Sequence, residues 1–209
     1  MRFTGFGAWW DSLRYVMKRL FDIICSLAGI LVLAPLMLVI AVIIKLTSRG
    51  PILFAQQRVG MNGKIFCVYK FRTMVYNAHI LGSSVTVRTD LRITAFGHFL
   101  RKSKLDELPQ LFNIFSGHMS FVGPRPDVPG FADKLYGKDR IILSVRPGIT
   151  GPATLKYREE EEILSRQADP DRYNAEVIYP DKVQINREYV ENYSFWKDMV
   201  YIWKTVFGE

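Results

Sequence analysis

An uncharged apolar run constrains this chain more than any other feature of its sequence. Between Ile23 and Ile44 there is no charged residue over about 22 positions. As a straight helix this run would reach roughly 33 Å, slightly more than the about 30 Å hydrocarbon core of a bilayer. It is longer than the apolar core of a typical signal peptide, and no small-residue cleavage site follows it. The sequence therefore predicts a membrane-associated N-terminal segment.

The topology of that segment depends on Pro35 and on the flanking charges. A proline inside a helix removes a backbone hydrogen bond and clashes with the preceding turn, so the helix kinks or breaks there. Lysine and arginine, which prefer the cytoplasmic side, flank the run at both ends (Arg14, Lys18, Arg19; Lys45, Arg49, Arg58, Lys64). A helix–break–helix hairpin that re-enters one leaflet keeps both groups inside, with arms of roughly a dozen residues and 18 Å each. A kinked single span is the alternative, since membrane helices tolerate proline.

The composition suits a membrane segment followed by one compact domain. The chain has 209 residues and a formal net charge of +8, a length typical of one domain with an appendage. We expect an N-terminal amphipathic and membrane segment over residues 1–48 and a single domain over residues 49–209. Cys25 and Cys67 have neither CxxC nor metal-binding spacing. The three histidines are too scattered for a zinc site (His79, His98, His118), so any metal should be a hard ion bound by oxygen.

Beyond the apolar run the pattern indicates both strands and helices. Residues 51–59 and 64–74 alternate with period two and flank the sequence GMNG, whose Asn62-Gly63 step is a strong hairpin-turn signal. Residues 77–92 are polar and poorly patterned, which predicts a loop. Apolar residues then recur at helical spacing in the segment ITAFGHFLRK.

The chain ends in an amphipathic stretch that predicts a helix. Ser194 is a suitable N-cap, and a broad apolar face follows it (Phe195, Trp196, Met199, Val200, Trp203, Val206, Phe207). Such a face, with Trp beside Lys, is typical of a helix lying in the membrane interface, although packing on a protein core is equally consistent. The predicted fold class is α+β: an N-terminal re-entrant membrane helix-break-helix, a β-hairpin, and a small, mostly helical cytosolic domain with interface-lying amphipathic helices.

Two adjacent carboxylates, Asp106 and Glu107, stand in the segment RKSKLDELPQLFNIFSGHMSFVGPRP. Pro109 is harmless only in the first turn of a helix, and Gly117 is a natural terminator after LPQLFNIFS. The sequence therefore predicts a helix with Asp106 as its N-cap. Both carboxylates would then lie in the partial positive field of the helix N-terminus and could face one site. A purely structural cap is the alternative for this pair.

Basic residues accompany the carboxylate pair, and their type suits phosphate. Guanidinium groups bind phosphate oxygens bidentately, and Arg125 is braced between two prolines. A carboxylate that approaches a phosphate anion needs cations and Mg²⁺ to neutralise the oxygens, so Asp106 and Glu107 are also candidate Mg²⁺ ligands. The candidate phosphate-binding residues are Arg101, Arg125, Lys70, Arg72 and Arg146.

A membrane-facing basic surface is the competing explanation for part of this charge. Attraction to anionic lipid headgroups accounts well for Lys18, Arg19 and Lys45, but poorly for an arginine held between prolines. We therefore assign Lys18 and Arg19, together with Pro35, to the membrane and headgroup region, and keep the other basic residues as candidates for the phosphate site.

Several ordered motifs then resemble the bacterial sugar transferase family, the monotopic phosphoglycosyl transferases that act on polyprenyl phosphate. They are KRLFDI, RVGMNGKIFCVYKFRTM, LRKSKLDELPQLFNIFSGHMSFVGPRP and VRPGITG, and they run from about Lys18 to Gly151. The chain is similar to the small, single-domain form. The resemblance implies transfer of a sugar 1-phosphate from a UDP-sugar to undecaprenyl phosphate with release of UMP, the first membrane step of a bacterial glycoconjugate pathway. It places the protein at the bacterial inner (cytoplasmic) membrane, with its catalytic domain on the cytoplasmic face.

The resemblance also implies roles for individual residues. Asp106 matches the nucleophile, which attacks the β-phosphorus and forms a covalent phosphosugar intermediate that polyprenyl phosphate displaces. Glu107 matches the partner carboxylate near Mg²⁺. Because a phosphate monoester is mostly ionised at neutral pH, we favour metal positioning over a general-base role for Glu107. Arg101 and Arg125 match cationic positions around the phosphates, and the N-terminal segment matches a re-entrant, broken helix.

Two departures from the family pattern concern the membrane helix and the sugar. Small members often break the helix at Ser-Pro, whereas this chain has Ala34-Pro35. After PGITG the family commonly continues with a Trp-Ala-Gln type stretch, whereas this chain reads PATLKYREEEEIL. We expect this region to shape the choice of sugar, which stays open, and the run Glu159–Glu162 to be a solvated face.

Two rival functions remain open from the sequence. A membrane-anchored, non-catalytic lipid- or anion-binding module would tolerate Asp106→Asn and bind with strong salt dependence, but a carboxylate pair inside a cationic cluster argues against it. A hydrolase that passes the phosphosugar to water would differ only in its acceptor. The expected partners are a UDP-sugar, polyprenyl phosphate and membrane lipid, with a homodimer left open and no nucleic acid.

Overall fold

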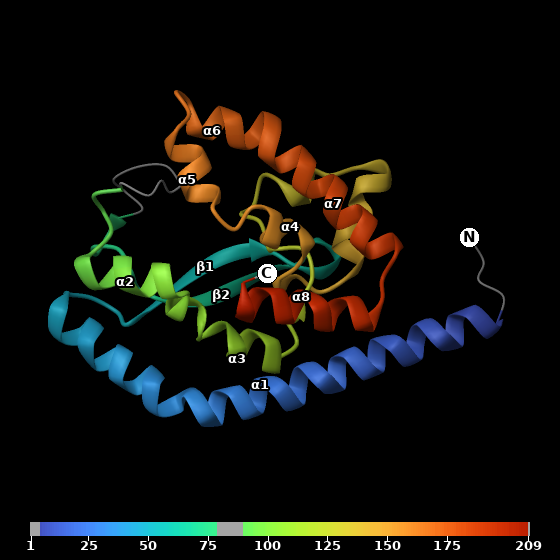
Figure 1. Ribbon diagram of the computed structural model, residues 1–209, viewed down its shortest axis with the longest axis horizontal. Helices are drawn as coiled ribbons and strands as arrows, with labels where there is room; N and C mark the ends of the chain where they lie inside the picture. Colours follow the sequence, from blue (N-terminus) through green and yellow to red (C-terminus); the bar gives the residue numbers. More distant parts are fainter. Residues whose placement is uncertain (1–4, 79–89, 209) are drawn as a thin grey trace.

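The structure is a computed structural model that describes residues 5–78 and 90–208. It is a mixed fold in which a long helix runs beneath two small sheets and a set of short helices (Figure 1). The strands are β1 (Leu53–Val59), β2 (Ile65–Phe71), β3 (Ser120–Val122) and β4 (Gly148–Thr150). The helices are α1 (Gly5–Thr47), α2 (Ala95–Ser103), α3 (Gln110–Phe115), α4 (Pro152–Lys156), α5 (Glu160–Ser165), α6 (Pro170–Tyr173), α7 (Tyr179–Glu191) and α8 (Phe195–Phe207).

Helix α1 contains the apolar run and does not stop at Pro35. It is continuous over 43 residues with the proline inside it, and its axis bends (Figure 1). The predicted interruption is therefore a bend, because proline removes one hydrogen bond and leaves the other turns of the helix intact. Within the described residues α1 is the one helix long and apolar enough to cross a membrane, and 11% of its most apolar window is buried.

The hairpin prediction is confirmed. Strands β1 and β2 pair antiparallel, from Leu53 opposite Phe71 to Val59 opposite Ile65. Asn62 and Gly63 both have positive φ, 58° and 75°, which is the left-handed backbone that Asn and Gly adopt most readily. The turn chemistry therefore sets the register that places Lys70 on the same face of the sheet as Phe66 and Val68.

Two buried clusters join the long helix to the rest of the chain. In one, Phe66 and Val68 of β2 pack with Leu111 and Ile114 of α3, and Ile30 and Leu33 of α1 lie against them. The other cluster lies at the far end of α1 (Ile40, Ile44, Phe71, Leu100). Because α3 is packed between α1 and the hairpin, the segment just before α3 is held at a fixed place above α1 (Figure 1).

A close approach of two glycines fixes the turn that carries Arg125. Strands β3 and β4 are parallel, and a Cβ added at Gly148 would lie 2.1 Å from the backbone nitrogen of Gly123. No side chain fits there, so the backbones can touch only because both residues lack one. The Pro124–Pro126 turn begins directly after Gly123, and its arginine is thereby aimed from a rigid base.

The helix over ITAFGHFLRK is confirmed as α2, with Thr94 as its N-cap accepting a hydrogen bond from the Gly97 amide. Of the predicted loop at 77–92, residues 79–89 lie outside the described residues, and His79 with them. Asp90 and Arg92 form an ion pair at 2.6 Å beside the start of α2.

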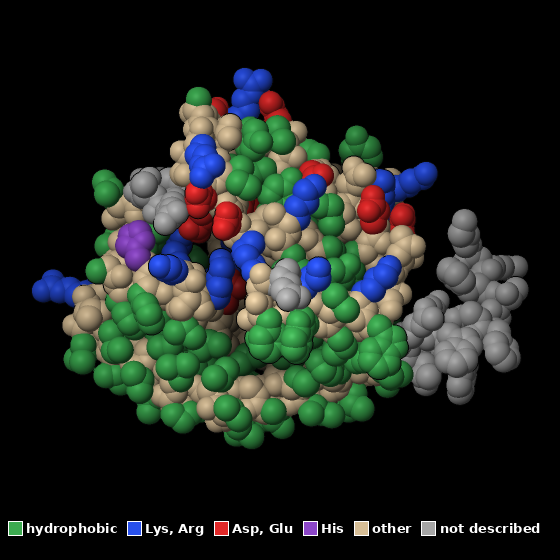
Figure 2. All heavy atoms as spheres, in the orientation of Figure 1, with side chains coloured by type: hydrophobic (Ala, Val, Ile, Leu, Met, Phe, Trp, Pro, Cys, Tyr) green, Lys and Arg blue, Asp and Glu red, His purple; other side chains and the backbone are tan. Residues whose placement is uncertain are grey.

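Helix α8 is the predicted C-terminal amphipathic helix, and its apolar face is open. Ser194 occupies the N-cap position without a side-chain capping bond. The exposed side chains include Trp196, Val200, Trp203, Val206 and Phe207. In the view of Figure 2, hydrophobic side chains gather along the lower part of the molecule, where α1 and α8 run, and charged side chains gather above them.

Candidate active site

Asp106 is buried at the floor of a wide cleft. It lies in a short 3-10 turn over Leu105–Glu107, and α3 begins only at Gln110. The predicted N-cap role for Asp106 is therefore wrong: its Oδ1 has no hydrogen-bond partner, and the residue is 7% exposed. Gly117, with φ of 86°, ends the helical stretch as predicted. A buried carboxylate oxygen without a partner is costly in a purely structural role.

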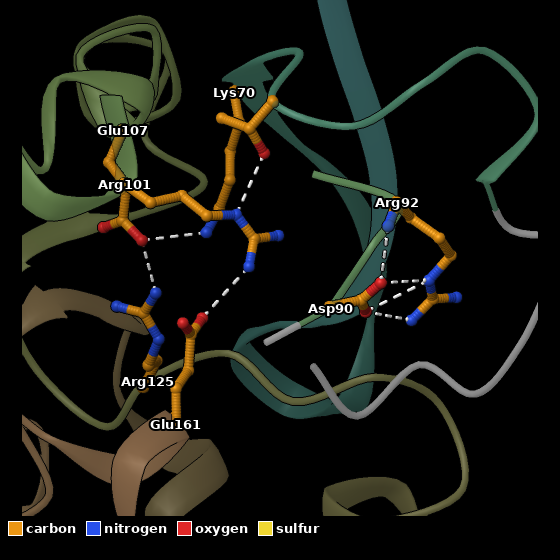
Figure 3. A network of polar contacts seen from close by, with 8 residues as sticks. Lys70, Asp90, Arg92, Arg101, Glu107, Arg125 and Glu161 are labelled. Atoms are coloured by element: carbon orange, nitrogen blue, oxygen red, sulfur yellow. Dashed lines mark hydrogen bonds and ion pairs between the residues drawn. The ribbon is translucent and has the colours of Figure 1, made fainter. Parts of the chain in front are cut away.

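Glu107, in contrast, is fully engaged by two cations (Figure 3). Its Oε1 accepts from the Lys70 ammonium at 2.8 Å and from the Arg125 guanidinium at 2.5 Å. Lys70 comes from the end of β2 and Arg125 from the proline-braced turn, so three separate segments meet at one oxygen. Arg125 also reaches the Ile149 carbonyl at 3.4 Å. Both cations retain further donors that can bind an anion in the cleft.

The two adjacent carboxylates differ in their proton affinity. Burial raises the pKa of Asp106, and the negative charge of Glu107 raises it as well, against the pull of Lys70 and Arg101. Burial would also raise the pKa of Glu107, but Arg125 and Lys70 hold it well below its usual value. Glu107 is thus an ionised anchor and a weak base at neutral pH, whereas burial and the charge of Glu107 both favour the protonated form of Asp106.

Arg101 lies at the rim of the same cluster. Its Nε donates to the Thr73 hydroxyl at 3.0 Å, and its Nη1 pairs with Glu161 at 3.1 Å. The acidic run was expected to be a solvated face, and Glu159 and Glu161 are exposed. All four residues also line the open cleft, and Glu160 pairs with Lys182 at 2.6 Å. Figure 3 shows the Arg101 guanidinium pointing toward the Glu161 carboxylate.

The other two candidate residues, Arg72 and Arg146, donate to backbone carbonyls of the protein, although Arg72 is also among the residues that line the cleft. Arg72 donates to the carbonyls of Pro51 and Ser48, and so ties the hairpin to the end of α1. Arg146 donates to the Gly117 carbonyl at 2.8 Å and is not among the residues that line the cleft.

The two residues assigned to lipid headgroups make contacts inside the protein. Lys18 pairs with the buried Asp198 of α8. Arg19 donates to the carbonyls of Ile114 and Phe115 at 2.7 Å each, and thereby caps the C-terminal end of α3.

Sequence reasoning did not select two half-buried charged residues near Arg125, Arg58 and Asp127, as site residues. Arg58 donates to the Pro126 carbonyl at 3.1 Å, and burial lowers its pKa to about 10. Burial raises the pKa of Asp127 to about 6. Arg58 could have been found, because it shares a strand face with Gln56 at period two, and in the observed register Lys70 lies on that face as well. Asp127 had no local signal.

Comparison with known proteins places these residues in a family. The model of the bacterial sugar transferase family matches residues 13–208. The chain belongs to this family. It is 41% identical over 201 residues, 93% of its length, to an exopolysaccharide production protein PSS of Rhizobium leguminosarum, of which it covers 95%.

Longer relatives match over the same region. The chain is 36% identical over 91% of its length to a UDP-N-acetylgalactosamine-undecaprenyl-phosphate N-acetylgalactosaminephosphotransferase of Aeromonas hydrophila. It is also 36% identical over 94% of its length to a UDP-glucose:undecaprenyl-phosphate glucose-1-phosphate transferase of Klebsiella pneumoniae. The chain spans 43% and 41% of these two relatives, so it corresponds to less than half of each.

The acidic residues of this bacterial sugar transferase fit an open Mg²⁺ site better than a protein cage. Over the described ranges, no group of three or more His, Cys, Asp or Glu side chains could hold a metal ion. Mg²⁺ is commonly held by one or two carboxylates together with substrate phosphates and water. The unpartnered Oδ1 of Asp106 suits that arrangement, whereas Glu107 Oε1 is already taken by Lys70 and Arg125.

Proposed function

We propose that the chain transfers a sugar 1-phosphate from a UDP-sugar to undecaprenyl phosphate, or another polyprenyl phosphate, and releases UMP. The observation that carries this proposal is the buried, unpartnered oxygen of Asp106 beside a carboxylate that holds two cations. The family membership supports it, since the Aeromonas and Klebsiella relatives are named for such transfers. Because the chain covers under half of those relatives, the activity is a proposal for this chain.

The chemistry divides into two displacements at one phosphorus atom. In the first, an Asp106 carboxylate oxygen bonds to the β-phosphorus of the donor, the bond from that phosphorus to the bridging oxygen breaks, and UMP leaves. In the second, an oxygen of polyprenyl phosphate attacks the same phosphorus and the bond to Asp106 breaks. The carboxylate is then restored and polyprenyl diphosphate sugar departs. A nucleophile that forms such a covalent intermediate splits one difficult transfer into two easier ones.

The cations around Asp106 would supply the electrostatic stabilisation. Charge on the transferring phosphoryl oxygens must be neutralised while a carboxylate approaches them. Lys70 and Arg125 are fixed for this task because Glu107 binds both, so we assign Glu107 a positioning role and not that of a general base. Arg101 can exchange its contact with Glu161 for a substrate phosphate. Mg²⁺, when bound with the donor at Asp106, would add Lewis-acid neutralisation of the diphosphate.

We also propose that α1 enters and leaves the membrane on one side. The same domain contacts both ends of its apolar run: Arg19 caps α3 just before the run begins at Ile23, and Arg72 binds Ser48 just after the run ends at Ile44. A bilayer cannot separate two ends that are fixed to one small domain. The apolar side chains of α1 and α8 remain open (Figure 2), which suits insertion into one leaflet with α8 in the interface. The flanking basic residues favour the cytoplasmic face of a bacterial inner membrane.

Release of UMP by the detergent-solubilised protein tests the transferase. The assay combines Mg²⁺ and undecaprenyl phosphate with UDP-glucose, UDP-galactose or UDP-N-acetylgalactosamine, because relatives are named for these sugars. Acceptor-dependent UMP release that is lost in Asp106→Asn and with chelator is the expected result. Without acceptor, intact-protein mass should rise by one sugar phosphate, and only in the wild type. Full activity of a folded Asp106→Asn variant would overturn the nucleophile assignment.

A further inference from the structure

The lining of the cleft includes a second group of residues whose buried polar atoms lack partners. Among the described residues that line the cleft, Asn186 Oδ1, Tyr179 OH and Thr154 Oγ1 make no hydrogen bond although each atom is buried. Asn186 is 6% exposed. Such atoms are rare in native proteins because each loses its water without compensation. Three of them on one stretch of cleft wall indicate a place that a polar ligand completes.

A single helix face builds most of this wall. Tyr179, Lys182, Val183 and Asn186 recur on α7 at intervals of three and four residues, and therefore share one side of the helix. Helix α4, which carries Thr154, packs against α7. The wall is thus built on helices and not on a free loop, so the orientation of its polar atoms is fixed by the fold.

The rim of this region is polar and charged. Lys182 holds Glu160 with two contacts of 2.6 and 2.7 Å, and its ammonium lies 5.5 Å from the ring of Tyr157. The positive charges of Lys182 and Arg125 both act to lower the pKa of Asp127, against the effect of burial. We call the region of Thr154, Glu160, Tyr179, Lys182 and Asn186 the distal polar lobe. Arg125 lies within electrostatic range of Glu160 in this lobe and of the Asp106–Glu107 pair, and all four residues line the same cleft.

We propose that the distal polar lobe binds the glycosyl group of the donor, with Asn186 and Thr154 as residues that determine sugar specificity. This inference rests on the proposed function. The sugar is bonded through one oxygen to the phosphorus that Asp106 attacks, so it must lie in the region adjoining the phosphate site, whereas the nucleoside is one phosphate farther away. Sugar hydroxyls both donate and accept, and they can therefore satisfy an amide oxygen and two hydroxyls together.

Other groups of the substrates match this lobe less well. A polyprenyl tail would leave all three unpartnered atoms buried against hydrocarbon, which is unfavourable. A uracil ring offers one N–H donor and two carbonyl acceptors, which suit the same three atoms, but the nucleoside is one phosphate farther from the phosphorus that Asp106 attacks. The lobe also includes the Glu160 region, where this chain carries PATLKYREEEEIL, so its sugar choice should follow from residues particular to this sequence.

The test compares a ligand that has the sugar with one that lacks it. For the wild type, Asn186→Leu and Thr154→Val, we would measure kcat/KM for each accepted UDP-sugar and the inhibition constant of UDP. We expect each variant to lower kcat/KM for the preferred donor by about tenfold, the value of one hydrogen bond, and to change the ratio between donors. The UDP constant should stay within about twofold of the wild type. Asn192→Leu, an exposed site at the end of α7, is the matched control without effect.

Each result decides for or against the inference. If Asn186→Leu fails to fold, Thr154→Val, which keeps the shape of the side chain, carries the test. Equal weakening of UDP and of the donors would assign the lobe to the nucleoside and overturn the proposal. Unchanged donor preference in both folded variants would also overturn it. A wild type that releases no UMP from any donor would overturn the proposed function and this inference with it, whereas an active wild type separates the two.

Discussion

Asn113 joins the helix that follows the carboxylate pair to the strand that carries Lys70. Its Oδ1 accepts from the Tyr69 amide at 3.0 Å and its Nδ2 donates to the Cys67 carbonyl at 2.7 Å. In the described sheet β2 pairs only with β1, so on its other edge these two backbone groups depend on Asn113, which is 1% exposed. Each bond contributes about 0.5–1.5 kcal/mol, and an unpaired buried group costs more. We expect Asn113→Ala to lower the free energy of unfolding by about 2–3 kcal/mol.

Thermal unfolding of the detergent-solubilised protein measures this effect. For a chain of this size, about 1 kcal/mol corresponds to about 2–4 °C, so the midpoint should fall by about 4–12 °C. The exposed Asn192, whose Nδ2 also donates to a backbone carbonyl at 3.1 Å, is the control, and Asn192→Ala should shift it by about 2 °C or less. The rate of UMP release should fall too, since Asn113 fixes α3 to β2. Equal shifts in both variants would refute the bridging role.

Three further predictions concern charge, packing and the membrane. The cations around Glu107 hold its pKa well below its usual value, against the opposing effect of burial. The stabilisation that ionised Glu107 gives to the folded state is therefore complete above about pH 4.5 and is lost as pH falls through the lowered pKa. The difference in unfolding temperature between wild type and Glu107→Gln should therefore be constant from about pH 8 to 6 and shrink below about pH 4.5. In Gly97→Ala the new Cβ would lie 2.0 Å from the Thr73 carbonyl oxygen, so we expect the free energy of unfolding to fall by about 2 kcal/mol or more. In Gly63→Ala the Cβ has open space and only the positive φ is unfavourable, so the fall should be about 1 kcal/mol. Trp203→Glu, on the exposed face of α8, should reduce sedimentation with anionic lipid vesicles and leave the unfolding temperature unchanged; unaltered sedimentation would refute insertion of that face.

The elements that the sequence predicted well are those with a local cause. The hairpin follows from period-two alternation and the left-handed preference of Asn62-Gly63. Helix α2 follows from its apolar spacing and its Thr94 cap. Helix α8 follows from its amphipathic face. In each case the information lies within a few residues, which is the range over which backbone sterics and side-chain periodicity act.

The sequence identified the carboxylate pair as a candidate site, but it could not predict which side chains the two carboxylates contact. Glu107 meets Lys70 from 37 positions away and Arg125 from 18, and no local pattern encodes either pairing. The N-cap prediction for Asp106 was wrong because i→i−3 bonds run from Lys104 through the proline before α3 begins. The difference between the two side chains arises from tertiary structure: Glu107 Oε1 accepts hydrogen bonds from Lys70 and Arg125, whereas Asp106 Oδ1 has no hydrogen-bond partner.

The basic pair before the apolar run shows how a tertiary contact changes the meaning of a sequence signal. Lys18 and Arg19 were assigned to lipid headgroups by charge and position. In the fold, Lys18 pairs with Asp198 and Arg19 caps α3, so their charges are used to attach α1 to the domain. For the topology proposed above, the positive-inside rule and these contacts would act in the same direction, because a helix attached beside α3 and again through Arg72 would keep both ends of its apolar run on one side of a bilayer. In the proposed topology, internal contacts such as the Lys18–Asp198 ion pair and the hydrogen bonds of Arg19 and Arg72 would hold α1 on one side of the bilayer, and a bend at Pro35 would be sufficient.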